Sequence, residues 1–203
     1  MPTLILDPAA ERQFNNLRTT AGLSQRDEVW EGVTVVMPLP DIEHQKIVAF
    51  MLRVLNQVFE PDDPVTCLPG ANVSDRIEGW ERNYREPDVV VVRDGGPARN
   101  CGTHWFGGPD FVLEIVSPDD QSRDKLPFYA SIRTREVLIL DRDPWQLELY
   151  QLRRGRLRLA GTARAGDAVL ASNVIPLTFA LVRGRPRPKV RITHAETGQD
   201  WTF

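Results

Sequence analysis

The sequence predicts an α/β (α+β) protein in which helices flank a central mixed β-sheet and further antiparallel strands follow at the C-terminal end. Two wholly apolar runs, Val89–Val92 and Val137–Leu140, are typical of strands that are covered on both faces. Residues 41–60 carry apolar side chains mostly at helical spacing, which predicts an amphipathic helix that covers one face of the sheet. These three segments together favour one layered core.

The first half of the chain predicts two helices, a hairpin and a long loop. Asp7-Pro8 forms a cap and first-turn pair, so a helix is expected over 7–20. Residues 28–37 are rich in β-formers with Gly32 between them, which predicts a short hairpin before the helix of residues 41–60. Residues 61–86 are polar and hold several Gly and Pro residues, so we expect an irregular loop there.

The second half of the chain is rich in predicted strands. Strands are expected over 87–92, 110–117, 137–141 and 147–150, with a helix that begins near Asp124. Residues 156–159 alternate between basic and apolar types, as a half-exposed strand does. The tail contains Pro176, Pro186 and Pro188, which favour an edge strand and extended segments.

Length and cysteine content set the domain number and the compartment that we expect. With 203 residues and 41% hydrophobic residues, the chain can bury one core. We therefore expect a single domain over 1–203, with its core over about 25–180 and a basic extension over about 181–203. The N-terminal residues lack the pattern of an export signal, no apolar run is long enough to span a membrane, and Cys67 and Cys101 are too few for a disulfide scaffold. These features predict a cytoplasmic protein without membrane contact.

The charges are unevenly distributed along the chain, although the net charge is only −3. Residues 151–191 contain ten basic residues and one acid, whereas residues 1–150 contain 15 basic residues and 25 acids. A basic C-terminal part can neutralise phosphates while an acidic remainder holds divalent cations, which suits an enzyme that acts on a polyanion. A solvated charged surface explains the same distribution.

Asp88 and Glu114 are carboxylates within strands that ought to be buried. A buried carboxylate is costly without a cation, a hydrogen-bond network or a metal. If the two strands are neighbours, Asp88 and Glu114 can bind Mg²⁺ or Mn²⁺, and Lys125 follows eleven residues after Glu114 at the start of the next helix. The alternative is structural: a strand-end Asp in a turn, a Glu paired with an arginine, and a solvated lysine.

Two acids and a lysine suit the hydrolysis of a phosphodiester. A metal ion lowers the pKa of a bound water and neutralises the phosphate, and a lysine stabilises charge in the transition state. The sequence has no Gly-Lys-Ser/Thr phosphate loop, no Gly-x-Gly-x-x-Gly turn and no Gly-x-Ser-x-Gly elbow, and its three histidines show no zinc-site spacing. Nucleotide binding and serine catalysis therefore have no support in the sequence.

The motifs around these residues resemble a known family. They are Arg85–Val92, Pro109–Pro118, Arg123–Tyr129 and Arg135–Trp145, and together they resemble the Uma2 family of restriction-endonuclease-like proteins, also called DUF820, over roughly residues 25–180. That family belongs to the PD-(D/E)XK nuclease-like superfamily. The resemblance implies a restriction-endonuclease-like core, a Mg²⁺ or Mn²⁺ cofactor and DNA as the substrate.

The resemblance also implies a role for individual residues. Asp88 would be the first metal ligand and Glu114 the second. Lys125 would be the catalytic lysine, displaced from its usual strand position because Val116 stands two residues after Glu114. Glu31 resembles the acid that such nucleases supply ahead of the first core helix, where it would complete the metal shell; it is equally well a polar residue beside a hairpin turn.

Three further residues are candidates for substrate binding. His44 on the long helix would reach the substrate or contact Glu31, Tyr129 lies one helical turn beyond Lys125, and Ser117 ends the Glu114 strand. Each also has a structural interpretation, in which His44 and Tyr129 pack against the sheet and Ser117 caps a loop. Relatives commonly have a glycine in the turn after the lysine helix, whereas this chain has Arg133-Thr134, so that turn must use another geometry.

The leading hypothesis is a metal-dependent endonuclease that hydrolyses phosphodiester bonds of DNA. The alternative is a catalytically silent protein of the same fold that binds nucleic acid or acts as a homo-oligomeric interaction module. A homodimer is expected under either hypothesis, because pairing about a two-fold axis is the commonest symmetry.

Overall fold

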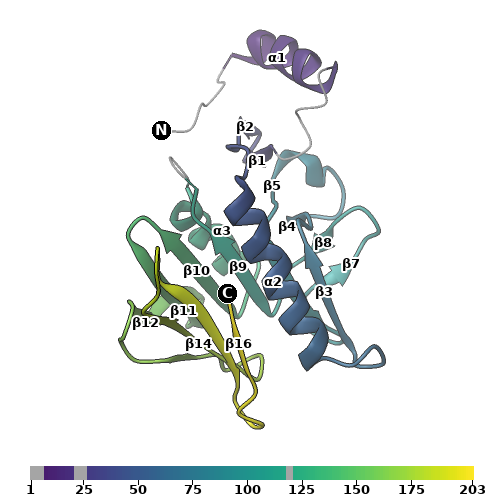
Figure 1. Ribbon diagram of the computed structural model, residues 1–203. Helices are drawn as coiled ribbons and strands as arrows, with labels where there is room; N and C mark the ends of the chain where they lie inside the picture. Colours follow the sequence, from purple (N-terminus) through teal and green to yellow (C-terminus); the bar gives the residue numbers. More distant parts are fainter. Residues whose placement is uncertain (1–6, 21–26, 118–120) are drawn as a thin grey trace.

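The computed structural model describes residues 7–20, 27–117 and 121–203 and shows a mixed α+β arrangement (Figure 1). The helices are α1 (Pro8–Thr20), α2 (Ile42–Val58) and α3 (Leu126–Ser131), with short 3-10 turns η2 (Trp80–Arg82) and η3 (Ser122–Lys125). Within these described ranges, no helix is long and apolar enough to cross a membrane.

The central sheet has the strand order β12-β11-β10-β9-β6-β3. Its strands are β3 (Val65–Pro69), β6 (Val89–Arg93), β9 (Phe111–Ile115), β10 (Glu136–Arg142), β11 (Trp145–Arg153) and β12 (Arg156–Ala163). The pair β9 and β10 is parallel and is connected through η3 and α3, whereas the other neighbours are antiparallel. The predicted mixed sheet is therefore confirmed.

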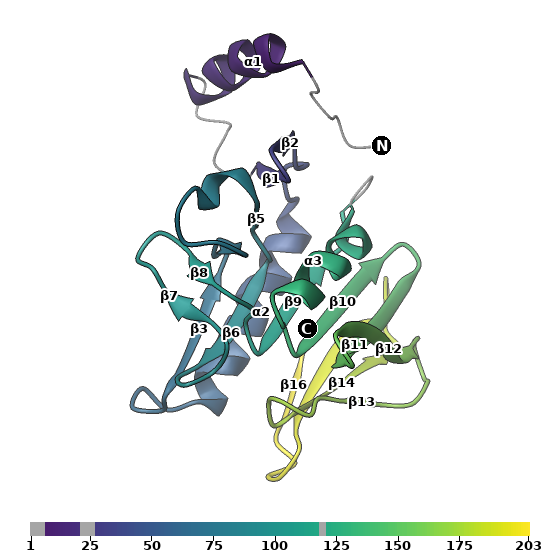
Figure 2. The same ribbon diagram turned by 180° about the vertical axis from the view of Figure 1, so that it is seen from behind.

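The two faces of the central sheet are covered by different helices, α2 on one and α3 on the other (Figures 1 and 2). Because strand side chains alternate between faces, Val89 and Val91 join the core beneath α2 while Val90 joins the core beneath α3. The same alternation places Leu113 with the α2 core, so the neighbouring Glu114 projects toward the α3 side. Both apolar runs are buried on both faces, as predicted.

Helix α2 begins where the sequence predicts. The side chain of Asp41 accepts a hydrogen bond from the backbone N–H of His44 at 2.7 Å, which satisfies one of the free donors at the helix N-terminus. The apolar residues of the helix, among them Ile47, Met51 and Leu55, face the sheet and are almost wholly buried. The cap and the first turn thereby fix His44 at the end of α2 that lies over the edge of the sheet.

A second sheet lies beside the α3 face and has the order β2-β1-β5-β4-β8-β7. Its strands are β1 (Glu28–Trp30), β2 (Val33–Val35), β4 (Val73–Ser74), β5 (Tyr84–Arg85), β7 (Arg99–Asn100) and β8 (Trp105–Phe106). The hairpin of β1 and β2 turns at Glu31 and Gly32, both with positive φ, as expected from Gly32. This sheet brings β1 against the Lys125 region.

The loop predicted over residues 61–86 is wrong, because β3, β4, η2 and β5 lie within that range. Strand β3 is half-exposed and pairs with β6 at the sheet edge, so its side chains lack the apolar alternation that marks a strand in sequence. β4 and β5 have two residues each and owe their conformation to pairing with distant strands.

The C-terminal part forms a sheet of its own rather than a single edge strand. Its order is β13-β14-β15-β16, with β13 (Leu170–Ala171), β14 (Leu177–Val182), β15 (Lys189–His194) and β16 (Asp200–Thr202), all antiparallel. The extra antiparallel C-terminal strands are thus confirmed. Leu181, Val190, Ile192 and Trp201 join the core beneath α2, so residues after position 180 are part of the main core.

Candidate active site

A polar cavity of about 240 Å³ lies where α2, β6, β9 and η3 meet. Its lining combines carboxylates, one lysine, one histidine and one serine with apolar side chains at the rim. The residues are Met37, Pro38, Pro40, His44, Gln45, Val48, Pro69, Gly70, Glu86, Pro87, Asp88, Glu114, Ser117 and Lys125. The structure therefore brings Asp88, Glu114 and Lys125 into one place, from three separate segments.

Asp88 lies immediately before β6, and both of its carboxylate oxygens are engaged. Oδ2 accepts the backbone N–H of Ile115 at 2.7 Å, which ties the start of β6 to the end of β9. Oδ1 lies 2.7 Å from Nε2 of His44. The carboxylate is 17% exposed, so it is fixed in position and still open to the cavity.

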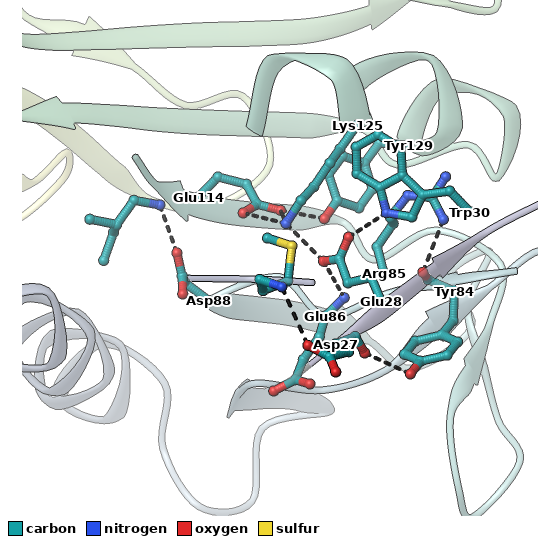
Figure 3. A network of polar contacts seen from close by, with 12 residues as sticks. Asp27, Glu28, Trp30, Tyr84, Arg85, Glu86, Asp88, Glu114, Lys125 and Tyr129 are labelled. Carbon is teal, nitrogen blue, oxygen red and sulfur yellow. Dashed lines mark hydrogen bonds and ion pairs between the residues drawn. The ribbon is translucent and has the colours of Figure 1, made fainter. Parts of the chain in front are cut away.

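Lys125 lies between two buried glutamates (Figure 3). Its Nζ is 2.8 Å from Oε1 of Glu28 and 3.1 and 3.2 Å from the two oxygens of Glu114. The side chains of Lys125, Glu28 and Glu114 are 2%, 1% and 3% exposed, so solvent screens these contacts little. The two negative charges offset the cost of burying the ammonium group.

The backbone around Lys125 explains how the helix tolerates Pro127. Lys125 is the last residue of η3, and α3 begins at Leu126, so Pro127 falls in the first turn of α3. A proline there removes no helical hydrogen bond because the first-turn N–H groups have no partner within the helix. At the far end, Arg133 adopts a φ of 70°, so this turn uses a left-handed residue without a glycine.

Tyr129 and Glu114 are also in contact on the α3 face of the sheet. The Tyr129 hydroxyl donates to Oε1 of Glu114, and the tyrosine is fully buried. Burial raises the pKa of Glu114, an effect that Lys125 opposes and the nearby charges of Asp88 and Glu28 increase. Burial and the charge of Glu114 likewise raise the pKa of Tyr129 well above its usual value, so the hydroxyl remains a donor at neutral pH.

Glu28 is a member of the site that the sequence does not indicate. Its Oε2 accepts from Nε1 of Trp30 at 2.7 Å, and its Oε1 accepts from the backbone N–H of Glu86 at 2.9 Å in addition to the contact with Lys125. The signal in the sequence is slight: Glu28 and Trp30 stand two residues apart, which places an acid and an indole donor on the same strand face.

Glu31 does not join this group, contrary to the expected role in the metal shell. It lies in the turn between β1 and β2, its side chain is 76% exposed, and it contacts Asn83 and Arg76 instead. The physical reason is the hairpin: Glu28 precedes the turn and faces inward, whereas Glu31 forms the turn and faces solvent. The description of Glu31 as a polar residue beside a hairpin turn fits the structure.

His44 and Ser117 lie together at the wall of the cavity. Nδ1 of His44 is 3.3 Å from the hydroxyl oxygen of Ser117, while Nε2 of the same ring contacts Asp88. His44 is only 5% exposed, and Ser117 is 7% exposed. The ring therefore connects the first turn of α2 to the Asp88 carboxylate, and it is placed to orient that carboxylate.

The donor set of the cavity fits a hard divalent cation. Asp88 and Glu114 offer oxygen ligands, and Glu86 adds a further carboxylate to the cavity lining. Lys125 is the basic residue of that lining. Among residues 7–20, 27–117 and 121–203, no three His, Cys, Asp or Glu side chains form a ready cage for a metal. Mg²⁺ does not require such a cage, because it keeps several waters and binds through one or two carboxylates together with substrate phosphate.

The fold is that of a nuclease-like α+β protein. A crystal structure described as that of "a putative nuclease belonging to DUF820" from Anabaena variabilis ATCC 29413 is similar to this chain, with a TM-score of 0.58 and 20% sequence identity over 72% of this chain and 80% of that chain. The chain belongs to the Uma2 family, described as "Putative restriction endonuclease", whose family model matches residues 12–183. No curated protein matches the sequence.

Proposed function

We propose that this chain is a Mg²⁺- or Mn²⁺-dependent endonuclease that hydrolyses phosphodiester bonds of DNA at the cavity of Asp88, Glu114 and Lys125. Membership of the Uma2 family supports a nuclease in general. The observation that carries the proposal is the convergence of two carboxylates and a buried lysine in one polar cavity. Such a cavity repels a phosphate unless cations neutralise its carboxylates, which is the reason for proposing a divalent ion.

In this proposal Asp88 and Glu114 hold the ion. Bound there, it would lower the pKa of a water and neutralise phosphate charge. His44 and the backbone N–H of Ile115 keep Asp88 oriented toward the cavity, as partners of metal ligands commonly do. These contacts exist within the protein itself, so the Asp88 carboxylate is positioned before the substrate arrives.

Lys125 supplies positive charge to the phosphate in the transition state. Glu28 and Glu114 hold its ammonium group from two sides, which fixes the group in position. Glu28 is thus a positioning residue for Lys125 rather than a metal ligand. Tyr129 fixes Glu114 through its hydroxyl and prevents the carboxylate from rotating.

The experiment is cleavage of supercoiled plasmid with Mg²⁺, with Mn²⁺ or with EDTA. We expect the native protein to nick the plasmid only with a divalent ion, and Glu114→Gln to lose at least about 100-fold in rate. Glu81→Gln serves as the matched control, because it makes the same chemical change at an exposed position outside the cavity. Circular dichroism confirms that the compared variants are folded.

Three results would contradict the proposal. They are cleavage that persists in EDTA, equal cleavage by native protein and Glu114→Gln, and an absence of cleavage on plasmid and single-stranded DNA together with no metal-dependent rise in melting temperature. The last result favours the catalytically silent protein.

The expected homodimer is tested separately, by passing the native protein over a calibrated size-exclusion column.

A further inference from the structure

The turn between β14 and β15 concentrates positive charge. Residues 183–189, here called the basic loop, read Arg-Gly-Arg-Pro-Arg-Pro-Lys and contain no acid. The side chains of Arg183, Arg185 and Lys189 are exposed. In the part of the chain that the structure describes, none of these three cations forms an ion pair with a carboxylate, whereas Arg187 does.

Arg187 anchors the basic loop beside the first turn of α2. Its guanidinium contacts Glu43, and it lies over the rings of Trp145 and Phe203 at 4.8 and 4.7 Å from their centroids. Glu43 is next to His44, which lines the cavity and contacts Asp88. Figure 1 shows the tip of the β14–β15 hairpin at the same end of the molecule as the start of α2.

The acids around the anchor are already neutralised. Asp41 pairs with Arg142 at 2.9 Å, and Arg142 also lies 3.6 Å from Glu43. The charges of Arg183, Arg185 and Lys189 are therefore not cancelled by these neighbours. Three like charges in so short a turn repel one another, and an external polyanion would relieve that repulsion.

The basic loop also has a restricted backbone. Pro186 and Pro188 fix their φ angles, and a side chain at Gly184 would meet the carbonyl oxygen of Arg187 at 2.7 Å and Cγ of Lys189 at 3.0 Å. The loop is thus closed tightly on itself. A loop of limited freedom loses less entropy when its cations bind a ligand.

We propose that the basic loop binds the phosphate backbone of the nucleic acid whose scissile phosphate enters the cavity, through Arg183, Arg185 and Lys189. The inference rests on the proposed function in taking nucleic acid as the substrate. It adds the surface that holds the substrate, placed on the C-terminal sheet outside the cavity. Contacts to phosphates position a nucleic acid without reading its sequence, so the basic loop contributes affinity and not specificity.

The test is fluorescence anisotropy of a fluorescein-labelled 20-base-pair DNA duplex in EDTA, which separates binding from cleavage. The variant Arg183→Gln/Arg185→Gln/Lys189→Gln removes the three free charges. The matched control, Arg154→Gln/Arg156→Gln/Arg158→Gln, removes three exposed charges from the β11–β12 turn and the start of β12. The control positions lie beside the far end of β11, from Gln151 to the turn after Arg153, about 20 to 27 Å along the strand from Trp145, which Arg187 contacts.

We expect the basic-loop variant to bind DNA at least about ten-fold more weakly than native protein at 0.1 M salt, and the plot of log affinity against log salt to become shallower by about 2.7. The control variant should stay within about three-fold of native protein. Equal losses in the two triple variants, native affinity in the basic-loop variant, or no binding by the native chain at 50 mM salt would overturn the proposal.

Failure of the basic loop and failure of the nuclease proposal give different results. In EDTA Glu114→Gln should bind the duplex at least as tightly as native protein, because it removes a carboxylate from the cavity, and yet not cleave plasmid in Mn²⁺. If the basic-loop variant loses DNA binding while native protein does not cleave, the basic-loop proposal is supported and the catalytic proposal fails. If native protein cleaves and the basic-loop variant binds normally, the catalytic proposal stands and the loop proposal fails.

Discussion

Lys125→Met is the substitution that probes the site most severely. It removes the ammonium group that contacts three carboxylate oxygens at 2.8 to 3.2 Å and leaves Glu28 and Glu114 buried without their cation. Breaking a buried ion pair from one side costs about 3 to 5 kcal/mol. We expect the lower end, about 3 kcal/mol, because the pKa of Glu114 is already raised and the orphaned carboxyl group can take up a proton.

A double-mutant cycle with Glu28→Gln isolates the interaction of Glu28 with Lys125. In the double variant the orphaned charge of Glu28 is absent, so the loss of stability should fall short of the sum of the two single losses by about 1 to 3 kcal/mol. Urea denaturation of the four proteins, followed by circular dichroism, gives the free energies of unfolding. The cycle of Glu81→Gln with Lys125→Met is the control and should be additive.

The pH dependence of the Lys125→Met variant provides a second readout. Without the cation, the folded-state pKa of Glu114 lies further above its unfolded value, so the folded variant binds more protons than the unfolded chain and loses stability as pH rises above about 4.5. Because the pKa of Glu114 is about 8 in the native protein, both proteins lose stability in parallel up to that pH, and the loss caused by the substitution should be larger at pH 9 than at pH 6. Additive losses with Glu28→Gln, or a loss below about 1 kcal/mol at pH 8, would refute the buried-pair reasoning.

Three further predictions concern other contacts. His44→Ala should weaken Mn²⁺ binding by about 10- to 100-fold, seen as a smaller metal-induced rise in melting temperature; an unchanged rise contradicts its role beside Asp88. Burial raises the pKa of Glu148, but hydrogen bonds from Arg123, Tyr150 and Gln146 outweigh this effect, so the pKa is lowered overall. Glu148→Gln should therefore reduce the free energy of unfolding at pH 7, and reduce it progressively less as pH falls below about 4.5. A reduction that does not depend on pH in urea denaturation contradicts this prediction. Arg133→Gly should raise the free energy of unfolding by up to about 1 kcal/mol, because glycine adopts a φ of 70° without strain; a loss in the same measurement contradicts this.

The sequence predicts those elements whose periodicity is strong. Helix α2 and the strands β6 and β10 have continuous or regularly spaced apolar residues, and each forms within two residues of the expected range. β4 and β5 carry no such pattern, because their two-residue lengths are set by pairing with strands far along the chain. The sequence predicts the C-terminal sheet only as extra strands and does not give their bounds, although the prolines mark the turns between them.

Site residues too can be predicted from the sequence only where the signal lies in the neighbouring residues. Asp88 and Glu114 are evident in sequence because a carboxylate inside an apolar strand is conspicuous. Glu28 is not, since its role depends on which face of β1 turns inward and on a contact with Lys125 about a hundred residues away. The family resemblance points to Glu31, whereas the hairpin register makes Glu28 the inward-facing acid.

The measurement that tests the central claim most directly is single-turnover cleavage of a labelled DNA duplex as Mn²⁺ is varied, for native protein and for Asp88→Asn. The substitution keeps the size of the side chain and removes the negative charge of the proposed metal ligand. We predict saturable metal dependence for the native protein and a midpoint at least about ten-fold higher in Mn²⁺ for Asp88→Asn, with DNA affinity in EDTA at least as high as that of native protein. Coincident Mn²⁺ curves for the two proteins would contradict the assignment of this cavity as the metal-dependent nuclease site.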